Sequence, residues 1–327
     1  MIQLLLLLVS VLSRDAYALD VVCTLPYLGS ITEDLAPDAH VTVLARGNED
    51  PHFLSPTPAL MAKVQQADLY VENGMSLELW SAKLLDSAGN PKVRRGQAGN
   101  VIASTNVPRL EVPTEITRAK GDLHPEGNPH VWLDPLNAPI IADNIAAGLA
   151  RVDPDHAADY EARADAFRAK VYEKTFGADL VGFMGGPLLD RLARAGNLQS
   201  FLEQKGLTGR LGGWLAAGAD LRGKPVVWYH QNMSYFTSRF GLDVVGHIED
   251  RPGIAPSAAH RAELANAMKA KGAKIIGVTT YYDDRLAQVL AEQTGARVVM
   301  IPGDVGGDAA STDWFAFVDD LVALLSK

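Results

Sequence analysis

Cysteine is almost absent from this sequence of 327 residues, which contains only Cys23. A chain with a single cysteine cannot close an internal disulfide, so its fold does not depend on one. Basic stretches are missing as well, because the net charge is −9 and no long block of one sign occurs. Proteins that neutralise nucleic-acid phosphates need such basic surfaces. We therefore expect no nucleic-acid partner, and we expect Cys23 to be a buried strand residue.

Long hydrophobic runs are also missing, apart from one at the start of the chain. Residues 2–13, IQLLLLLVSVLS, are too few for a helix that crosses a bilayer. Ala-Tyr-Ala at 16–18 is typical of a cleavage site, although no lysine or arginine precedes the apolar run. We predict a secretory signal over 1–18, and a protein that is periplasmic, soluble after cleavage and not membrane-spanning.

The remaining sequence alternates short apolar runs with helical periodicity, in its first half and again in its second. Strands are expected at Leu19–Thr24, His40–Leu44, Leu69–Val71, Pro225–Tyr229, Val244–Ile248, Lys274–Val278 and Val298–Ile301. Helices are expected at 57–66, 76–86, 137–151, 232–240, 257–271, 285–294 and 312–325. This alternation predicts an α/β fold with two lobes, each with a parallel sheet flanked by helices.

A long helical pattern separates the two halves. Its apolar positions step by three and four residues from Ala157 to Val171, which is one face of an amphipathic helix. About 22 residues at 1.5 Å each would span roughly 33 Å, enough to join two lobes rigidly. The predicted organisation is a signal peptide, an N-terminal α/β lobe, a linking helix, a helical insertion and a C-terminal α/β lobe, at 1–18, 19–152, 153–177, 178–222 and 223–327.

One histidine, His130, lies in the segment GNPHVWLDP at 127–135. Asp134 and Pro135 indicate a helix start, with Asp134 as the capping residue and Pro135 in the first turn. His130 therefore lies in a short loop that enters a helix, where functional residues are common. Taken alone, such a histidine is more often a structural core residue than a ligand, so the segment leaves both interpretations open.

Other metal-capable side chains follow expected strands. In open α/β sheets, ligands bind beyond the carboxyl ends of the strands. His52 comes after the strand at 40–44, His230 directly follows the strand at 225–229, and two aspartates, Asp283 and Asp284, follow the strand at 274–278. Three imidazoles with one carboxylate suit tetrahedral Zn²⁺, and nitrogen donors disfavour Mn²⁺, Mg²⁺ and Ca²⁺. The hypothesis depends on the fact that several metal-capable residues each follow a strand, and not on any one of them.

The remaining histidines are weaker candidates for metal ligands. His124 lies in the loop GDLHPEG, where we expect it to be exposed and, at most, a transient metal-capture group. The others share no common locus and are expected to be structural or solvated: His40, His156, His247 and His260.

Four stretches, DPHFLSPTPALMAKVQQADLYVENGMSLELW, NPHVWLDPLNA, WYHQNMSYFTSRFGLDVVG and TGARVVMIPG, resemble the metal-binding solute receptors of ABC importers, the zinc and manganese group. The resemblance implies two α/β lobes linked by one long helix, with the metal between them. It places the metal ligands at His52, His130, His230 and Asp283, with Asp284 as the alternative to the last. Manganese members carry a carboxylate where His230 stands, so the chain resembles the zinc type. Its short histidine loop and longer 178–222 segment depart from the family pattern.

The resemblance implies an exported receptor that captures Zn²⁺ and delivers it to an ABC importer permease, without catalysis of its own. We expect a monomer, with a periplasmic metallochaperone as a further candidate partner. The alternatives are a manganese receptor of the same class, a surface adhesin or chaperone without a permease, and a zinc-dependent hydrolase. The hydrolase would use the same histidines with Glu49 or Asp284 as general base. The sequence contains no HExxH, GxSxG or CxxC motif that would mark such an enzyme.

Overall fold

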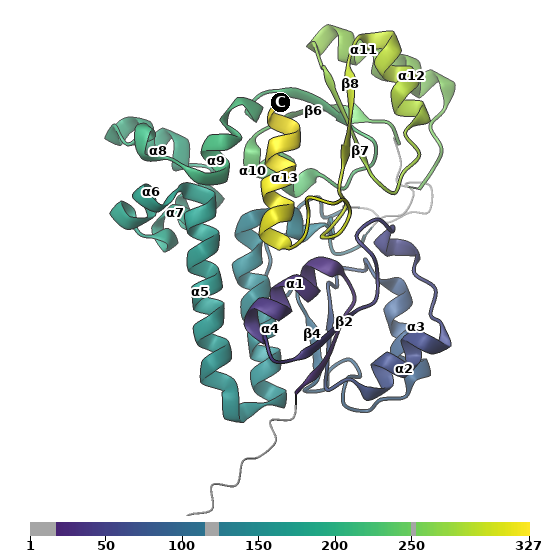
Figure 1. Cartoon of the computed structure of the whole chain (residues 1–327). Coiled ribbons are helices and arrows are strands. Elements are labelled where there is room, and N and C mark those ends of the chain that lie inside the picture. The colour runs from purple at the N-terminus through teal and green to yellow at the C-terminus, as the bar shows by residue number, and fades with distance from the viewer. Residues whose placement is uncertain (1–17, 115–123, 250–252) are drawn as a thin grey trace, which may run out of the picture.

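Two four-stranded parallel sheets form the framework of the protein, each covered by helices (Figure 1). This architecture comes from a computed structural model, in which residues 18–114, 124–249 and 253–327 are described. The predicted fold class, two α/β lobes with parallel sheets, is confirmed. None of the helices in the described residues has the length and apolarity needed to cross a bilayer.

The first sheet has the strand order β2-β1-β3-β4, and all its pairings are parallel. Its elements are β1 (Asp20–Cys23), α1 (Pro26–Leu35), β2 (His40–Val43), α2 (Pro58–Gln66), β3 (Leu69–Glu72), α3 (Leu79–Ala88), β4 (Asn100–Ile102) and α4 (Ala138–Val152). The central strand β1 is Val-rich and buried, as expected of a parallel strand covered on both faces. Cys23 is buried there as a free thiol, as predicted.

The second sheet repeats this arrangement, with the order β6-β5-β7-β8 and only parallel pairings. Its elements are β5 (Pro225–Trp228), α10 (Ser234–Phe240), β6 (Asp243–His247), α11 (Ala258–Lys271), β7 (Ile275–Thr279), α12 (Arg285–Thr294), β8 (Arg297–Ile301) and α13 (Trp314–Ser326). In both sheets the chain reverses its direction of strand addition beside the first strand. Crevices for ligands form at the carboxyl ends of the strands at such switch points.

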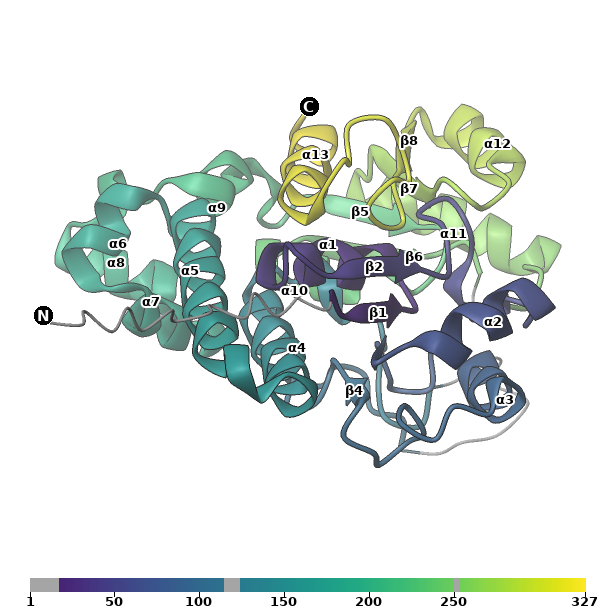
Figure 2. The same ribbon diagram turned by 60° about the horizontal axis from the view of Figure 1, so that its bottom comes forward.

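A helical segment connects the sheets. The long helix α5 (Ala157–Phe176) lies against α4, as Figures 1 and 2 both show. The chain then continues through α6 (Ala178–Met184), α7 (Gly186–Arg194), α8 (Leu198–Lys205) and α9 (Gly213–Ala217). The insertion has its own apolar cluster, built on Phe176, Leu180, Leu189 and Leu202.

Two elements were not anticipated from the sequence, α1 and β4. Residues of α1 include Gly29, Ser30 and Thr32, which are weak helix formers, and the N-cap position makes no side-chain hydrogen bond. The helix exists because one face is buried against the rest of the core, including Tyr27 and Ile31. Packing therefore overrides the local preference.

The two lobes share a core and are not joined by α5 alone. Helix α13 follows the last strand of the second sheet and packs against α1 of the first lobe. Phe167 of α5 lies 5.7 Å from Trp314 and 5.1 Å from Phe315 between ring centroids. The Trp314 backbone N–H also donates to the Ser30 hydroxyl at 2.9 Å. Burying large aromatic rings between the lobes stabilises one relative arrangement of the two sheets.

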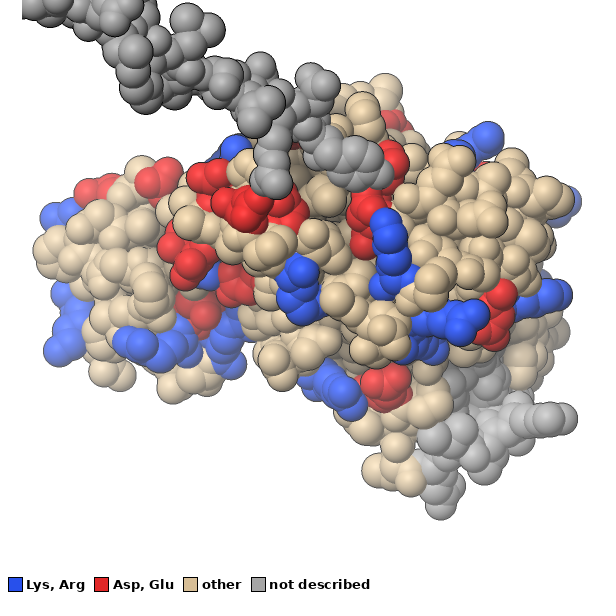
Figure 3. All heavy atoms as spheres, turned by 90° about the horizontal axis from the view of Figure 1, so that it is seen from below, with Lys and Arg blue, Asp and Glu red and all other residues tan. Residues whose placement is uncertain are grey.

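Charge on the surface is mixed. Seen from below, lysine and arginine side chains stand among acidic ones, separated by larger uncharged areas (Figure 3). Lys271 and Asp243 form an ion pair in which both side chains are exposed. Exposed pairs of this kind contribute little to the free energy of unfolding.

One buried ion pair crosses between the lobes, from Asp134 before α4 to Arg239 of α10. The guanidinium donates two hydrogen bonds to the carboxylate, at 2.8 and 2.7 Å, and both side chains are only 10% exposed. Asp134 also accepts from the Leu136 N–H, as the predicted helix cap. This pair fixes the segment that carries His130.

Replacing Asp134 by alanine should lower the free energy of unfolding by about 3–5 kcal/mol, because Arg239 would stay buried without a counter-charge. The control is Asp243→Ala, which breaks the exposed pair with Lys271 and should cost at most about 1 kcal/mol. Chemical denaturation of both variants measures the difference. Equal, small losses would contradict the role assigned to the buried pair.

Candidate metal centre

His52 lies in the 3₁₀ turn Pro51–Phe53, after β2. Asp50 caps this turn, and its carboxylate accepts from the His52 backbone N–H at 3.0 Å and from Nδ1 of the ring at 2.7 Å. The indole N–H of Trp80 donates to the Pro51 carbonyl at 2.9 Å and holds the turn in place. Because a carboxylate accepts, Nδ1 carries a hydrogen, and in the neutral ring Nε2 presents a lone pair.

His130 is held by the same local pattern. Asn128 Oδ1 accepts from the His130 backbone N–H at 3.1 Å and from Nδ1 at 2.9 Å. The Asn128 amide donates to a Glu111 carboxylate oxygen and to the Gln231 carbonyl, both at 2.8 Å, so its oxygen must face the ring. The sequences Asp-Pro-His and Asn-Pro-His thus have the same effect, because each orients an imidazole so that Nε2 points away from its own loop.

His230 comes from the other lobe, directly after β5. Its Nδ1 lies 2.9 Å from a carboxylate oxygen of Glu249, which follows β6. Tyr282, after β7, packs beside the ring with a centroid distance of 5.6 Å. The carboxyl ends of three neighbouring strands therefore position this histidine and its partner.

The structure brings the three predicted histidines together and adds His124 to them. Neighbouring rings have centroids 5.2–6.4 Å apart. Four imidazoles bound to a tetrahedral zinc, with Zn–N of about 2.0–2.1 Å, would have centroids about 5 Å apart. In the described ranges, no group of three or more His, Cys, Asp or Glu side chains is spaced so that it could hold a metal ion as it stands. The ring centroids are therefore slightly farther apart than they would be around a bound zinc ion.

Beside the rings is a cavity of about 200 Å³ that opens between the lobes. It is lined by Asp50, His52, Phe53, His124, His230, Glu249, Gly253 and Tyr282. His130 closes the inner end of the cluster, because it is only 2% exposed. Its Nε2 is buried and has no hydrogen-bond partner among the described residues. A buried nitrogen lone pair without a partner is costly unless something binds it.

Asp283 does not join the cluster in this structure. Its carboxylate is half exposed and accepts from the backbone and side-chain N–H groups of Arg285, which lower its pKa. Asp284 accepts from the Gln288 side chain at the start of α12. From this strand end, Tyr282 is the residue that reaches the cavity. Among the histidines expected to be structural or solvated, the His156 ring lies against the Asp153 carboxylate, and the His260 ring lies against the His247 carbonyl.

Sequence reasoning missed one buried acid, Asp304, although the rule used for His52 and His230 could have found it. Asp304 follows β8, the fourth strand of its sheet, and is 6% exposed. Its carboxylate accepts from the N–H groups of Val305 at 2.7 Å and of Tyr27 in the first turn of α1. Burial raises the pKa of this carboxyl well above its usual range. The residue ties the second lobe to a helix of the first.

Comparison with known proteins identifies relatives over most of the chain. A sequence model of the family described as the periplasmic component A of the zinc-uptake complex, ZnuA, matches residues 21–175 and 209–327. The unmatched stretch between them contains most of the helical insertion.

Individual relatives share about a quarter to a third of their aligned residues with this chain. The high-affinity zinc uptake system protein ZnuA of Bacillus subtilis is 26% identical over 288 residues, which are 86% of this chain and 77% of that protein. The iron-binding protein YfeA of Yersinia pestis is 31% identical over 186 residues, 56% of this chain, and the chain spans about half (51%) of its length.

Solved structures show the same fold. A zinc-bound ZnuA deletion mutant superposes with a TM-score of 0.69 at 22% identity, covering 94% of this chain and 97% of the other. A manganese-bound periplasmic metal-binding protein from Candidatus Liberibacter asiaticus gives a TM-score of 0.65 at 21% identity, with 94% and 97% covered.

The environment of His130 predicts an unusual titration in the metal-free protein. Burial, followed by the neighbouring imidazoles, lowers its pKa well below the ordinary 6.5. The folded protein therefore keeps this ring neutral where the unfolded chain protonates it, so its contribution to stability falls as pH drops below about 6.5. NMR of the ring protons should show that His130 titrates with a pKa well below the ordinary 6.5. A midpoint near 6.5 would contradict the burial described above.

Proposed function

The chain belongs to the family of periplasmic zinc-uptake components, and we propose that it captures Zn²⁺ between its two lobes and delivers it to the permease of an ABC importer. Three imidazoles are the proposed core of the site: His52, His130 and His230. The supporting observation is that Nδ1 of each ring lies against an acceptor, which leaves Nε2 to bind metal. Among these nitrogens, Nε2 of His130 is buried and has no hydrogen-bond partner in the described residues, so it gains most from binding a metal.

Zinc is the metal that the donors favour. Imidazole nitrogen suits Zn²⁺, whereas Mn²⁺ and Mg²⁺ prefer oxygen donors. Neutral imidazoles bring no charge to the ion, but the carboxylates of Asp50 and Glu249 lie directly behind His52 and His230. These two negative charges offset the two positive charges of the ion. Such carboxylate–histidine–metal arrangements orient the ring and raise its basicity.

The family consists of solute receptors, so the chain is a receptor and not an enzyme. The candidate general bases are also poorly placed for hydrolysis. Glu49 lies in an exposed pair with Arg46, and Asp284 is engaged by Gln288. The resemblance implied Asp283 as a fourth ligand, but that residue would first have to release Arg285. The three histidines are therefore the proposed ligands, and the Asp283→Ala variant tests whether Asp283 contributes.

The purified protein should bind one zinc per chain, and His130→Ala should weaken binding at least ~100-fold, more than the loss of a residue behind a ligand. Elemental analysis and competition with a zinc chelator measure both quantities. The matched control is His156→Ala, which removes an exposed histidine bonded to Asp153 and should leave affinity unchanged. Zinc retained equally by both variants would refute the proposed site, and tighter binding of manganese than zinc would refute the metal.

The carboxylate behind His230 should also matter. Glu249→Ala should weaken zinc binding by about 10–100-fold, because the ring loses both its orienting acceptor and a compensating charge. Glu249→Gln should lie between the alanine variant and the natural protein, since an amide oxygen still accepts from Nδ1. The same chelator competition distinguishes them. If both variants bound zinc as tightly as the natural protein, Glu249 would have no part in the site.

A further inference from the structure

The histidine that the family resemblance did not assign to the metal, His124, makes the contacts of a metal donor. Its Nε2 lies 3.2 Å from Nε2 of His52. Its Nδ1 lies 3.2 Å from the Ser76 carbonyl oxygen, while Nδ1 of His52 lies against the Asp50 carboxylate. A carbonyl and a carboxylate only accept hydrogen bonds, so each Nδ1 carries a hydrogen, and the two Nε2 atoms face each other across a gap that either a shared proton or a cation must bridge. A divalent cation there would bind the lone pairs of both neutral rings at once.

We propose that His124 is the fourth metal donor, so that zinc is held by four imidazoles. Three of these, from His52, His124 and His130, belong to the lobe of the first sheet, and only His230 belongs to the second. The first lobe would therefore supply most of the coordination, and the second lobe would complete it. This inference rests on the proposed function, because it concerns a ligand of the same ion.

A strained turn holds the acceptor that orients His124. Gly74, Met75 and Ser76 follow one another in the left-handed region, with φ of 87°, 54° and 60°. Residues other than glycine rarely adopt this conformation, and it persists where the surroundings enforce it, commonly at functional sites. Here it directs the Ser76 carbonyl toward the His124 ring.

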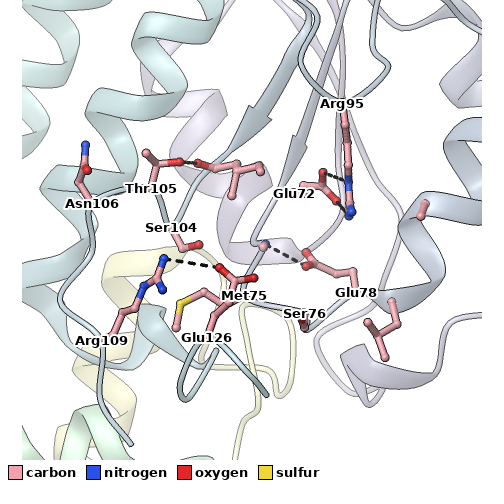
Figure 4. A pocket seen from close by; sticks show the side chains of 14 residues that line it. Glu72, Met75, Ser76, Glu78, Arg95, Ser104, Thr105, Asn106, Arg109 and Glu126 are labelled. Carbon is pink, nitrogen blue, oxygen red and sulfur yellow. Dashed lines mark hydrogen bonds and ion pairs between the residues drawn. The ribbon is translucent and has the colours of Figure 1, made fainter. Parts of the chain in front are cut away.

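The buried carboxylate of Glu78 enforces the turn. One oxygen accepts from the Asn73 N–H at 2.7 Å and from the Thr24 hydroxyl. The other accepts from the Gly74 N–H at 3.0 Å (Figure 4). A cavity of about 430 Å³ borders the turn, so these hydrogen bonds, rather than close packing on that side, hold it. The Asn73 amide also donates to the Pro129 carbonyl, beside His130. The same network thus supports the loops of two proposed donors.

The competing fourth donors are the two aspartates after strands of the second sheet, Asp283 and Asp304. Either would give three imidazoles and one carboxylate. X-ray absorption at the zinc edge distinguishes the two sets, because imidazole rings add characteristic outer-shell scattering. The zinc-loaded natural protein should give four imidazoles per zinc. A count of three with one added oxygen donor would overturn the inference without affecting the proposed receptor function.

A variant series tests the same point independently. His124→Ala should reduce the imidazole count to three and weaken zinc affinity at least about tenfold. His156→Ala should change neither quantity, and Asp283→Ala should leave the count at four. If His124→Ala bound zinc as tightly as the natural protein while His130→Ala did not, only this inference would fail. If His130→Ala also bound zinc normally, the proposed function itself would fail.

Discussion

The hydrogen bond from Nδ1 of each histidine to a fixed acceptor is the interaction on which the proposed metal centre depends. An imidazole has two nitrogens on opposite sides of the ring, so fixing one of them determines where the other points. Asp50 and Asn128 do this for His52 and His130 through the same Asx-Pro-His pattern. Each Asx side chain also accepts from the backbone N–H of its histidine, so ring and loop are fixed together. The donor atoms therefore hold their directions before any metal arrives, which lowers the entropy lost on binding.

These histidines converge only because the two lobes are held together. The shared aromatic core around Phe167 and Trp314, the buried pair of Asp134 with Arg239, and the contact of Asp304 with α1 all join one lobe to the other. Gly47 adds a close approach, because a Cβ atom there would lie 2.0 Å from the Val305 carbonyl oxygen. These contacts favour one relative arrangement of the two lobes. That the stiff linking helix resists hinge motion stays a prediction.

Much of this could be predicted from the sequence, because the dominant signals are local. Alternating strand and helix patterns predicted both sheets, and side chains after strands pointed to His52 and His230. The contact of His124 with His52 depends instead on the turn at Ser76, far from both in the sequence, and its strained φ angles have no sequence signature. Asp283 and Asp284 were both candidates by their place after a strand, and the family resemblance favoured Asp283. In the structure the Asp283 carboxylate instead accepts hydrogen bonds from its neighbour Arg285. Whether a carboxylate binds a neighbouring arginine or faces a metal site can be seen only in the structure.

Crystals of the zinc-loaded protein, measured on either side of the zinc absorption edge, test the central claim most directly. The account predicts one anomalous peak between the lobes, about 2.0–2.1 Å from Nε2 of His52, His130 and His230. A peak elsewhere, a peak bound through Nδ1 atoms, or no peak at all in crystals grown with stoichiometric zinc would contradict it.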